Sequence, residues 1–380
     1  MSETTGIQWT DHTGGPYLGC SCVSPGCTFC YAMALALTRP ERIFRTAYKR
    51  AEFADWETRP VWGDKATRVL SKGFWNDARR INANHAKEGT RGRWFPSMID
   101  WLDKMPGGII DQDGKPLDPI EVRSNFLKLI YETPNLDWLL LTKRPENFFE
   151  HIGEVYMHEV HTGPNSGQSF RLWLAGWESE LAPPDNVWIG ASCEDQQRAN
   201  ERVPHLLKIP AIIRFLSLEP LLGPINLRTI ILEEGVYVRK GIDCLNDSDW
   251  IENASSNGQW GSRRTWKIGG CETYKVDWII CGGESGQGAR PCNIEWIRDI
   301  VNQCRGVSIS CFVKQLGGFA AQDLSYSIPE ADITNPELDP ADIASWEFHR
   351  HHARMHLKHS KGGDPEEWPE DLKVRCFPRP

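Results

Sequence analysis

Short apolar runs alternate with amphipathic stretches over most of the 380-residue chain. The runs that we expect to form strands are Gly6–Thr10, Arg93–Met98, Asp137–Thr142, Asn186–Ser192, Ala211–Leu218, Asp277–Gly282 and Ser308–Lys314. Helical patterns lie between several of them, at Val122–Tyr131, Pro145–Ile152, Gln196–Leu207 and Ile294–Cys304. Strands that alternate with helices predict βα units and a parallel sheet.

The composition of the strands narrows this fold class. Segments 138–141 and 278–281 are apolar on both faces, as a sheet covered by helices requires. Six or seven such units predict an α/β fold, a complete or partial TIM-type (β/α) barrel over residues 1–319, with residues 320–380 as an extension that packs on it. Residues 157–185 and 228–275 are rich in Gly, Ser, Asn and Trp and lack sustained periodicity, so we expect two irregular surface insertions.

Charge and hydropathy exclude some functional classes. A net charge of −8 argues against a protein that coats nucleic acid through bulk electrostatics. No apolar run approaches the roughly 20 residues of a membrane span, and the N-terminus lacks the features of a secretory signal. We therefore expect a cytoplasmic protein without a membrane partner. The exception to the acidic balance is the basic segment 65–93. Phe74, Trp75 and Trp94 lie in or beside it, and we expect them either to stack on bases or to belong to the core.

Cysteine usage points to chemistry. The chain has 12 cysteines, and the eight beyond position 190 lie mostly in apolar runs, where cysteine behaves as a small buried hydrophobic residue. The other four, Cys20, Cys22, Cys27 and Cys30, lie within eleven residues. In a reducing compartment such a cluster indicates metal binding or catalysis more often than disulfides.

The cysteine loop, residues 19–31, follows the first expected strand and precedes a helical stretch at 32–37. It therefore belongs to the first βα loop, on the face where barrel enzymes build their active sites. Four thiolates would form a zinc site, although the second knuckle that structural zinc usually has is missing from this segment. Three thiolates can hold a [4Fe–4S] cluster with one open iron, and Phe29 stands just before the last cysteine, as in radical S-adenosylmethionine enzymes.

Polar residues recur at the expected C-terminal ends of six strands, which is how a barrel assembles one site from many loops. A helix cap or a surface ion pair explains any single one of them equally well, but the recurrence is the stronger observation. The residues are Asp100, Lys143, Arg144, Ser192, Glu194, Ser217, Glu219, Glu284, Ser285, Lys314 and Gln315.

Several sequence blocks together resemble a radical-SAM-like family that is common in phages and prophages. Its members carry the same C-x6-C-x2-C-Y-A signature, which differs from the commonest C-x3-C-x2-C spacing. The matching blocks include Ile7-Gln-Trp-Thr-Asp11, Gly19-Cys20, Ser24-Pro-Gly-Cys27-x-x-Cys30-Tyr-Ala32, Trp138-Leu-Leu-Leu-Thr-Lys-Arg-Pro145 and Gly282-Gly-Glu-Ser-Gly286, and further blocks lie within residues 93–100, 187–194, 214–224, 312–318 and 368–375. The likeness extends over nearly the whole chain and excludes the two insertions.

The resemblance implies a set of cofactors and site residues. Cys20, Cys27 and Cys30 would hold a [4Fe–4S] cluster, and Cys22 would be an additional thiol. S-adenosylmethionine would be the second cofactor, and an external electron donor would reduce the cluster. The expected cofactor contacts are Phe29, Ser192, Glu194, Ser217, Glu219, Glu284 and Ser285, and the expected substrate contacts are Asp100, Lys143 and Arg144.

The resemblance is also the guide to the substrate. Phage relatives are associated with the modification of nucleic-acid bases, and one implied activity isomerises an N-linked glycinyl group on the thymine methyl to a C-linked one. The expected partner is then nucleic acid, above all DNA, or a modified nucleobase. If a phage encodes the protein, we expect it to act in the host cytoplasm. Two alternatives stay open: a zinc-stabilised, non-enzymatic nucleic-acid-binding protein that uses all four cysteines, and a radical SAM enzyme that acts on tRNA or a peptide.

Overall fold

The computed structural model describes residues 5–162, 167–179, 182–235, 238–253, 264–267, 275–286, 288–322, 354–355 and 357–378. The chain divides into two compact units. Unit 1 comprises residues 1–192 and 201–216 together with residue 380, and unit 2 comprises residues 193–200 and 217–379.

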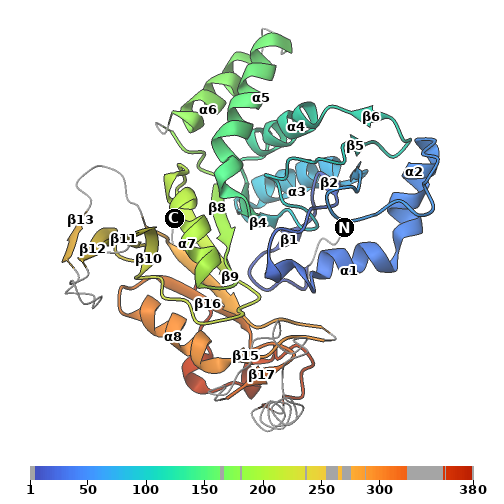
Figure 1. Ribbon diagram of the computed structural model, residues 1–380. Coiled ribbons are helices and arrows are strands. Elements are labelled where there is room, and N and C mark those ends of the chain that lie inside the picture. The colour runs from blue at the N-terminus through green and yellow to red at the C-terminus, as the bar shows by residue number, and fades with distance from the viewer. Residues whose placement is uncertain are drawn as a thin grey trace. The chain divides into compact units, whose positions relative to one another are not determined.

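A parallel sheet with flanking helices confirms the predicted α/β class (Figure 1). Its seven strands follow the order β1-β4-β7-β8-β9-β14-β16, which is compatible with a partial (β/α) barrel. The strands are β1 (His12–Thr13), β4 (Gly92–Phe95), β7 (Leu136–Thr142), β8 (Val187–Ser192), β9 (Ile213–Leu218), β14 (Trp278–Gly282) and β16 (Ser310–Gln315).

The first strand lies later in the chain than the sequence predicts. Residues 6–10 form no strand, because the chain turns there: the Thr10 amide donates to the carbonyl of Ile7 at 3.4 Å. Trp9 is buried and its ring packs on Phe95 at a centroid distance of 4.7 Å. The prediction of a strand at residues 6–10 is therefore wrong, and the buried Trp9 anchors a turn there instead.

Helices cover the strands of unit 1. In Figure 1, α3, α4, α5 and α6 follow one another, and each packs on the next. Local sequence explains where two of them begin and end: the Asp118 side chain caps α4 by accepting from the Ile120 amide, and Gly89, with φ of +66°, ends α3. The bounds are α3 (Phe74–Glu88), α4 (Pro119–Glu132), α5 (Phe148–Thr162), α6 (Gln168–Glu178) and α7 (Gln196–Lys208).

Aromatic side chains form the centre of this unit. Trp94 of β4 pairs in register with Trp138 of β7, and their ring centroids lie 5.5 Å apart. Phe74 and Phe126 pack on the edges of the Trp138 ring. Phe74 and Trp94 are fully buried, so of the two interpretations of the basic segment, base stacking is wrong for both residues and the core interpretation is confirmed.

The cysteine loop lies beside a small second sheet of unit 1. Its order is β2-β3-β5-β6, from β2 (Tyr17–Leu18), β3 (Arg68–Leu70), β5 (Ile109–Ile110) and β6 (Pro116–Leu117). Strands of two or three residues leave no periodic signal, and the sequence did not predict them. The segment between β2 and β3 contains α1 (Tyr31–Thr38), the π-helical turn η2 (Glu41–Arg45) and α2 (Thr46–Arg50). Buried Phe44, Tyr48 and Val69 hold this segment to the sheet.

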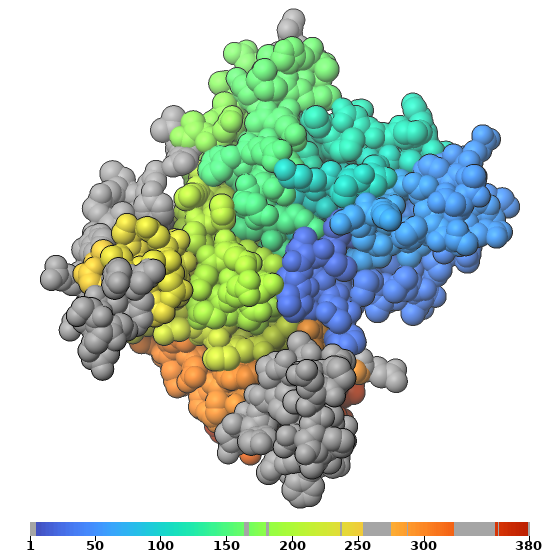
Figure 2. All heavy atoms as spheres, in the orientation of Figure 1, coloured from blue at the N-terminus to red at the C-terminus, as the bar shows by residue number. Residues whose placement is uncertain are grey.

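The first predicted insertion is helical. Residues 157–185 contain the end of α5 and all of α6. Phe170, Leu174 and Trp177 follow a helical spacing and are buried, a signal that composition obscured. The side chains of α5 and α6 form the upper part of unit 1 on the face shown in Figure 2. The prediction of an irregular insertion is wrong here.

The second predicted insertion contains a four-stranded antiparallel sheet of unit 2. The strands are β10 (Ile230–Glu234), β11 (Val238–Asp243), β12 (Ser248–Asn253) and β13 (Arg264–Lys267), in that order. Ile242 and Trp250 are both buried and lie on opposite faces, because Trp250 pairs with Gly241 and Ile242 with Asp249. Exposed ion pairs such as Lys240–Glu233 join neighbouring strands. The prediction of irregular structure is therefore wrong for the described part of residues 228–275.

The rest of unit 2 surrounds β14 and β16, which pair in parallel. The helix α8 (Ile294–Arg305) begins at Asn293, whose side chain accepts from the Glu295 amide. Two further strands pair in parallel, β15 (Cys292–Asn293) and β17 (Ala320–Ala321).

The described part of the C-terminal segment lies along β16 of the same unit. The Val313 amide donates to the carbonyl of Val374 at 2.8 Å, and Leu372 is buried. Two 3₁₀ turns, η5 (Pro365–Glu367) and η6 (Glu370–Leu372), complete it. Within the described residues of the chain, none of the helices has the length and apolar character needed to cross a membrane.

Candidate functional site

The cysteine loop ends in a tight turn that leads into α1. The Cys27 amide donates to the carbonyl of Ser24 at 2.9 Å, and the Cys30 amide donates to the carbonyl of Cys27 at 3.3 Å. Cys30 is the N-cap residue of α1, and Cys27 is buried within the turn η1 (Pro25–Cys27). The backbone therefore fixes Cys27 and Cys30 on the same turn.

Cys22 and Cys20 differ in their surroundings. Cys22 is exposed and hydrogen-bonds to the Cys27 thiol; partial burial, with the neighbouring Cys27 and Cys30 thiols, raises its pKa. The Cys20 thiol instead donates to the carbonyl of Ser21 at 3.4 Å and lies 3.9 Å from Nη1 of Arg144. Burial and the Asp100 carboxylate raise the pKa of Cys20 to about 12, against the opposing effect of Arg144.

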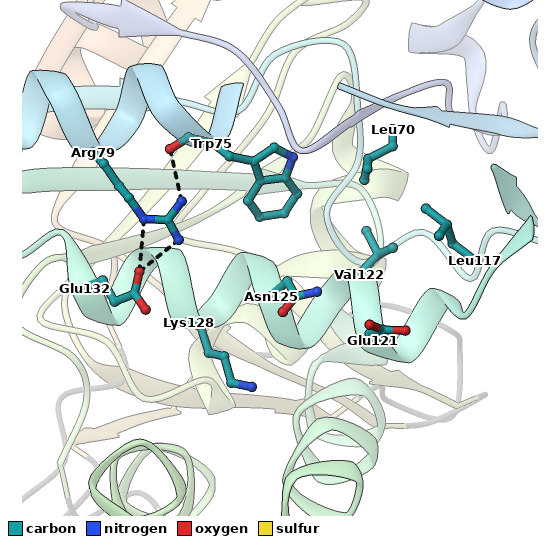
Figure 3. A pocket seen from close by; sticks show the side chains of 9 residues that line it. All are labelled: Leu70, Trp75, Arg79, Leu117, Glu121, Val122, Asn125, Lys128 and Glu132. Carbon is teal, nitrogen blue, oxygen red and sulfur yellow. Dashed lines mark hydrogen bonds and ion pairs between the residues drawn. The ribbon is translucent and has the colours of Figure 1, made fainter. Parts of the chain in front are cut away.

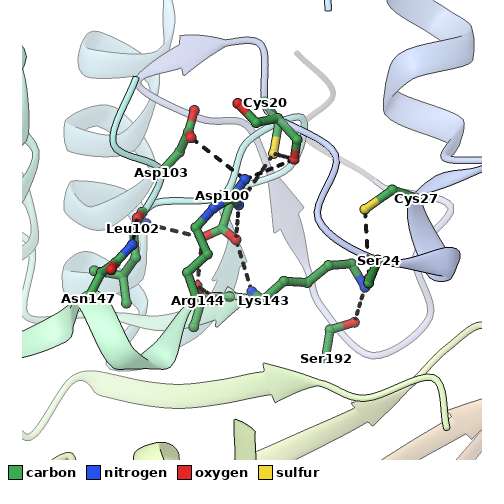
Figure 4. A network of polar contacts seen from close by, with 12 residues as sticks. Cys20, Ser24, Cys27, Asp100, Leu102, Asp103, Lys143, Arg144, Asn147 and Ser192 are labelled. Atoms are coloured by element: carbon green, nitrogen blue, oxygen red, sulfur yellow. Dashed lines mark hydrogen bonds and ion pairs between the residues drawn. The ribbon is translucent and has the colours of Figure 1, made fainter. Parts of the chain in front are cut away.

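Arg144 and Asp100 form a buried ion pair behind this loop. The Arg144 Nη1 atom donates to Asp100 Oδ2 at 2.8 Å, and Nη2 donates to the carbonyl of Ser21 at 2.9 Å. Asp100 also accepts from the Thr142 hydroxyl at 2.6 Å and from the Lys143 amide at 2.9 Å. One carboxylate thus joins the chain after β4 to the end of β7 (Figure 4).

A second buried arginine holds the same stretch of loop. Arg68 of β3 donates from Nη2 to the Ser21 hydroxyl at 2.6 Å and from Nε to Asp103 Oδ2 at 2.9 Å. Its side chain is fully buried, and it also donates to the carbonyls of Gly63 and Ala66. We call Arg68, Asp100, Asp103 and Arg144 the buried charge cluster.

Lys143 extends in a different direction from its neighbour. Its Nζ atom donates to the hydroxyl of Ser192, at the end of β8, at 2.9 Å (Figure 4). The Ser192 carbonyl accepts from Nη1 of Arg202 at 2.6 Å. Two cations therefore converge on Ser192, which is itself buried.

A polar pocket of about 840 Å³ opens beside these residues. Its size is within the usual range for small-molecule sites. The loop residues Ser21, Cys22 and Val23 form part of its wall. The lining carries charges of both signs, which suits a ligand with both charges. Its basic residues are Lys104, Lys143, Arg144, Arg202 and His205, and its acidic residues are Asp64, Asp103, Glu146 and Glu201.

A second hollow of unit 1 lies between α3 and α4 (Figure 3). This α3–α4 groove, of about 290 Å³, is lined by Leu70, Trp75, Arg79, Leu117, Glu121, Val122, Asn125, Lys128 and Glu132. Arg79 donates to the Glu132 carboxylate at 2.9 Å across it, and both side chains are about half exposed. Cysteine is absent from this lining.

The structure brings together only part of the predicted site. Cys20, Asp100, Arg144, Lys143 and Ser192 form one connected set within unit 1. Phe29 belongs to the same unit, and its side chain is 44% exposed. The other predicted cofactor contacts, Glu194, Ser217, Glu219, Glu284 and Ser285, belong to unit 2.

Two of the unit 2 carboxylates are engaged by cations. Glu284 accepts from the Arg290 amide at 3.0 Å and from its guanidinium, and its side chain is buried. Glu219 pairs with Lys314 at 3.2 Å. Glu194 and Ser217 are buried, and Ser285 is partly exposed.

Sequence reasoning missed Arg68, Ser21 and Asp103. Arg68 stands in a three-residue strand, and Ser21 is one of many serines, so neither carries a signal of its own. Asp103 follows Asp100 by three residues after a strand, and this repeated carboxylate was the available clue. Burial of both carboxylates beside arginines becomes visible only in three dimensions.

Most of the later cysteines behave as the sequence predicts. Cys193, Cys244, Cys281, Cys292, Cys304 and Cys311 are buried, whereas Cys376 is exposed and Cys271 lies outside the described residues. Burial also raises the pKa of the Cys292 thiol to about 12, which keeps it neutral.

The donor set of the cysteine loop fits an iron–sulfur cluster in its chemistry. Soft thiolates are the ligands of such clusters, and the loop offers four thiols in eleven residues. The geometry is not that of a preassembled centre: across the described residues, no group of three or more Cys, His, Asp or Glu side chains is placed to hold a metal ion. Cluster binding would therefore require the thiols to move together.

Fold and site define an α/β protein with a thiol-rich loop beside a polar pocket. The chain belongs to a protein family described as "Protein of unknown function (DUF5131)", which it matches over residues 4–362. Searches of curated proteins and of solved structures found no match.

Proposed function

We propose that the protein is a radical SAM enzyme whose cysteine loop holds a [4Fe–4S] cluster. The observation that carries the proposal is the loop itself: Cys20, Cys27 and Cys30 stand before α1 in unit 1, and Ser21, Cys22 and Val23 of the same loop line a polar pocket. Soft thiolates favour iron–sulfur chemistry. When bound, the cluster with S-adenosylmethionine at its open iron would use one electron from an external donor to supply a 5′-deoxyadenosyl radical.

The residues of the chain would position the reactants. Cys27 and Cys30 are fixed by the turn before α1, and the buried charge cluster anchors the loop through Ser21. Lys143, with its ammonium on Ser192, would meet an anionic group of a ligand in the pocket. Arg144 is already committed to Asp100 and Ser21, so we assign Lys143 rather than Arg144 the substrate contact.

For the substrate we propose a nucleobase, and within that class the glycinyl-modified thymine of phage DNA, which would be isomerised from the N-linked to the C-linked form. The support is the sequence resemblance together with the mixed charge of the pocket lining, whose cations suit a phosphate group and whose carboxylates suit an ammonium group. A base within a duplex would have to be flipped out to reach such a pocket.

Anaerobic reconstitution with iron and sulfide tests the enzyme class. We expect bound iron and the release of 5′-deoxyadenosine from S-adenosylmethionine under reduction. Both should be lost in Cys27→Ala and kept in Cys376→Ala, a matched control that removes an exposed thiol of unit 2. Bound zinc without iron, and intact S-adenosylmethionine, would instead support the zinc-stabilised binding protein.

Nucleoside analysis of modified phage DNA after incubation with the reconstituted enzyme tests the substrate. The proposal predicts that the N-linked glycinyl nucleoside decreases while the C-linked isomer appears. Cleavage of S-adenosylmethionine with DNA left unchanged would reject this substrate and keep the enzyme class, and tRNA and peptide would then be assayed in the same way.

A further inference from the structure

A third hollow lies in unit 2, where the C-terminal segment packs on the chain that follows β16. Its volume is about 260 Å³, and its lining comes from within residues 317–320 and 354–360. Three of the lining residues are basic, Arg354, Lys358 and His359, and none of the described lining residues is acidic. The pocket beside the cysteine loop and the α3–α4 groove, in contrast, both carry carboxylates as well as cations. We call the third hollow the basic pocket.

Backbone contacts fix both ends of the C-terminal stretch that lines the basic pocket. The Met355 amide donates to the Ala320 carbonyl at 2.8 Å, and the Leu316 amide donates to the Gly362 carbonyl at 2.9 Å. The indole of Trp368 donates to the same Gly362 carbonyl at 3.0 Å. The cations of the pocket therefore extend from backbone that is held in place.

Arg354 and Lys358 both have N–H groups to offer an anion. Arg354 donates from Nη2 to the Gly318 carbonyl at 3.0 Å, and its guanidinium lies over the Phe319 ring at 5.0 Å. A guanidinium carries several N–H donors, so this anchoring leaves others for a ligand. Lys358 is exposed, and its ammonium makes no hydrogen bond or ion pair with the described residues.

The His359 imidazole is oriented by backbone amides. Its Nδ1 atom accepts from the amides of Lys361 and Gly363, at 3.3 and 3.0 Å. Because Nδ1 is an acceptor, the neutral ring carries its proton on Nε2, which can donate to an oxygen of a ligand. The Glu367 carboxylate accepts from the His359 amide at 3.2 Å and is not part of the lining. The lining also includes Ser360, whose hydroxyl is a further donor.

A phosphate group suits this set of donors. Charge-assisted hydrogen bonds from arginine, lysine and histidine to phosphate oxygens are among the stronger ones in proteins. The volume of the basic pocket is just below the usual range for small-molecule sites, so it fits the phosphate-bearing part of a larger ligand. Local cations can supply such contacts even on a protein with a net charge of −8.

Nucleic acid fits the pocket better than a membrane surface does. Segments that bind at a membrane surface combine basic residues with exposed apolar side chains that enter the lipid. The large apolar side chains that are exposed in the described part of the chain include none from residues 354–363. The lining therefore offers charge without an apolar face, as contacts to a nucleic-acid backbone require.

We propose that the basic pocket binds a backbone phosphate of nucleic acid through Arg354, Lys358 and His359. Nucleic acid is also the partner in the proposed function, but this pocket belongs to unit 2 and requires neither the cysteine loop nor a cluster. Phosphate contacts position a nucleic acid without reading its bases. The role assigned to the pocket is therefore to anchor the strand independently of its sequence.

Fluorescence anisotropy of a labelled DNA oligonucleotide, titrated with the full-length chain at several salt concentrations, tests the proposal. Lys358→Gln and Arg354→Gln should each weaken binding and reduce the slope of log affinity against log salt concentration by about one. The loss should be equal for two unrelated base sequences, because the contact is to the backbone. Lys115→Gln removes an exposed lysine of unit 1 that lines none of the three hollows, and it should leave the slope unchanged.

Unchanged DNA affinity and slope in both variants would overturn the proposal. This holds also if the variants lose binding to a free nucleotide or to vesicles of anionic lipid, which would assign the pocket to those ligands instead. The Lys358 ammonium contacts none of the described residues, so Lys358→Gln keeps the test decisive if Arg354→Gln disturbs the loop at Gly318.

The outcomes also separate this inference from the proposed function. Protein that takes up no iron but binds DNA through Arg354 and Lys358 would lose the enzyme class and keep the basic pocket. Cleavage of S-adenosylmethionine together with DNA binding that neither variant changes would keep the enzyme class and reject the pocket.

Discussion

The two hollows of unit 1 hold ion pairs of opposite character. Beside the cysteine loop, Arg144–Asp100 and Arg68–Asp103 are buried, with side chains less than 10% exposed. In the α3–α4 groove, Arg79 and Glu132 are each nearly half exposed (Figure 3). Buried ions lose their hydration and must be fully paired, whereas exposed ions are solvated with or without a partner. The charges behind the loop therefore need their partners for the fold to be stable, whereas the charges of the groove do not.

The largest expected effect comes from breaking the buried pair. Asp100→Ala leaves the Arg144 guanidinium buried without its carboxylate, and we expect the free energy of unfolding to fall by about 3–5 kcal/mol. Urea denaturation measures this loss. Asp113→Ala, which removes an exposed partner of Arg50, is the matched control and should cost less than about 1 kcal/mol. Equal losses in the two variants would contradict the comparison.

A pH effect of similar size is expected from His151 of α5. Burial and nearby Arg123 lower its pKa from 6.5 to about 4. Above pH 6.5 the imidazole is neutral in the folded and unfolded chains. As the pH falls towards 4, the unfolded chain binds the proton first, so the free energy of unfolding decreases by up to about 3 kcal/mol.

The measurement is the pH dependence of urea denaturation for wild type and His151→Gln. The variant should lose this part of the acid sensitivity, and the control His161→Gln, at an exposed histidine of the same helix, should keep it. Identical pH profiles for wild type and His151→Gln would contradict the lowered pKa.

The contrast between the ion pairs of the two hollows could be predicted from the sequence only in part. Strand–helix alternation predicted β7, β8, β14 and α7 closely, because these elements are long and consistently apolar or amphipathic. The cysteine loop was recognised from its composition alone. The pairing of Asp100 with Arg144, and of Arg68 with Ser21, was not, since it depends on side-chain direction across segments far apart in the chain.

The two insertions show the same limit. Glycine, serine and tryptophan obscured α6 and the sheet of β10–β13, whose short elements are stabilised by tertiary contacts such as buried Trp177 and Trp250. Local propensity was outweighed by packing in both places.

An intermediate effect on stability is expected where the buried charge cluster contacts the cysteine loop. Ser21→Ala removes the hydroxyl that accepts from buried Arg68, and we expect a loss of about 1–3 kcal/mol in the free energy of unfolding. Thiol alkylation of Cys22 should also become faster as the loop loosens. Thr28→Ala removes an exposed hydroxyl of the same loop and should change neither quantity appreciably. A similar effect of both substitutions would argue against the anchoring role.

The smallest effect should come from the α3–α4 groove. A double-mutant cycle with Arg79→Ala and Glu132→Ala should give a coupling energy below about 1 kcal/mol, because solvent and salt screen the pair. High salt should reduce it further. A coupling energy of several kcal/mol would erase the distinction between the two hollows.

Electron paramagnetic resonance of the anaerobically reconstituted, reduced protein, recorded before and after addition of S-adenosylmethionine, tests the central claim most directly. The account predicts a [4Fe–4S] signal that changes when S-adenosylmethionine binds at the open iron, and that is absent in Cys27→Ala. A colourless, zinc-loaded protein, or a cluster signal that S-adenosylmethionine leaves unchanged, would contradict it.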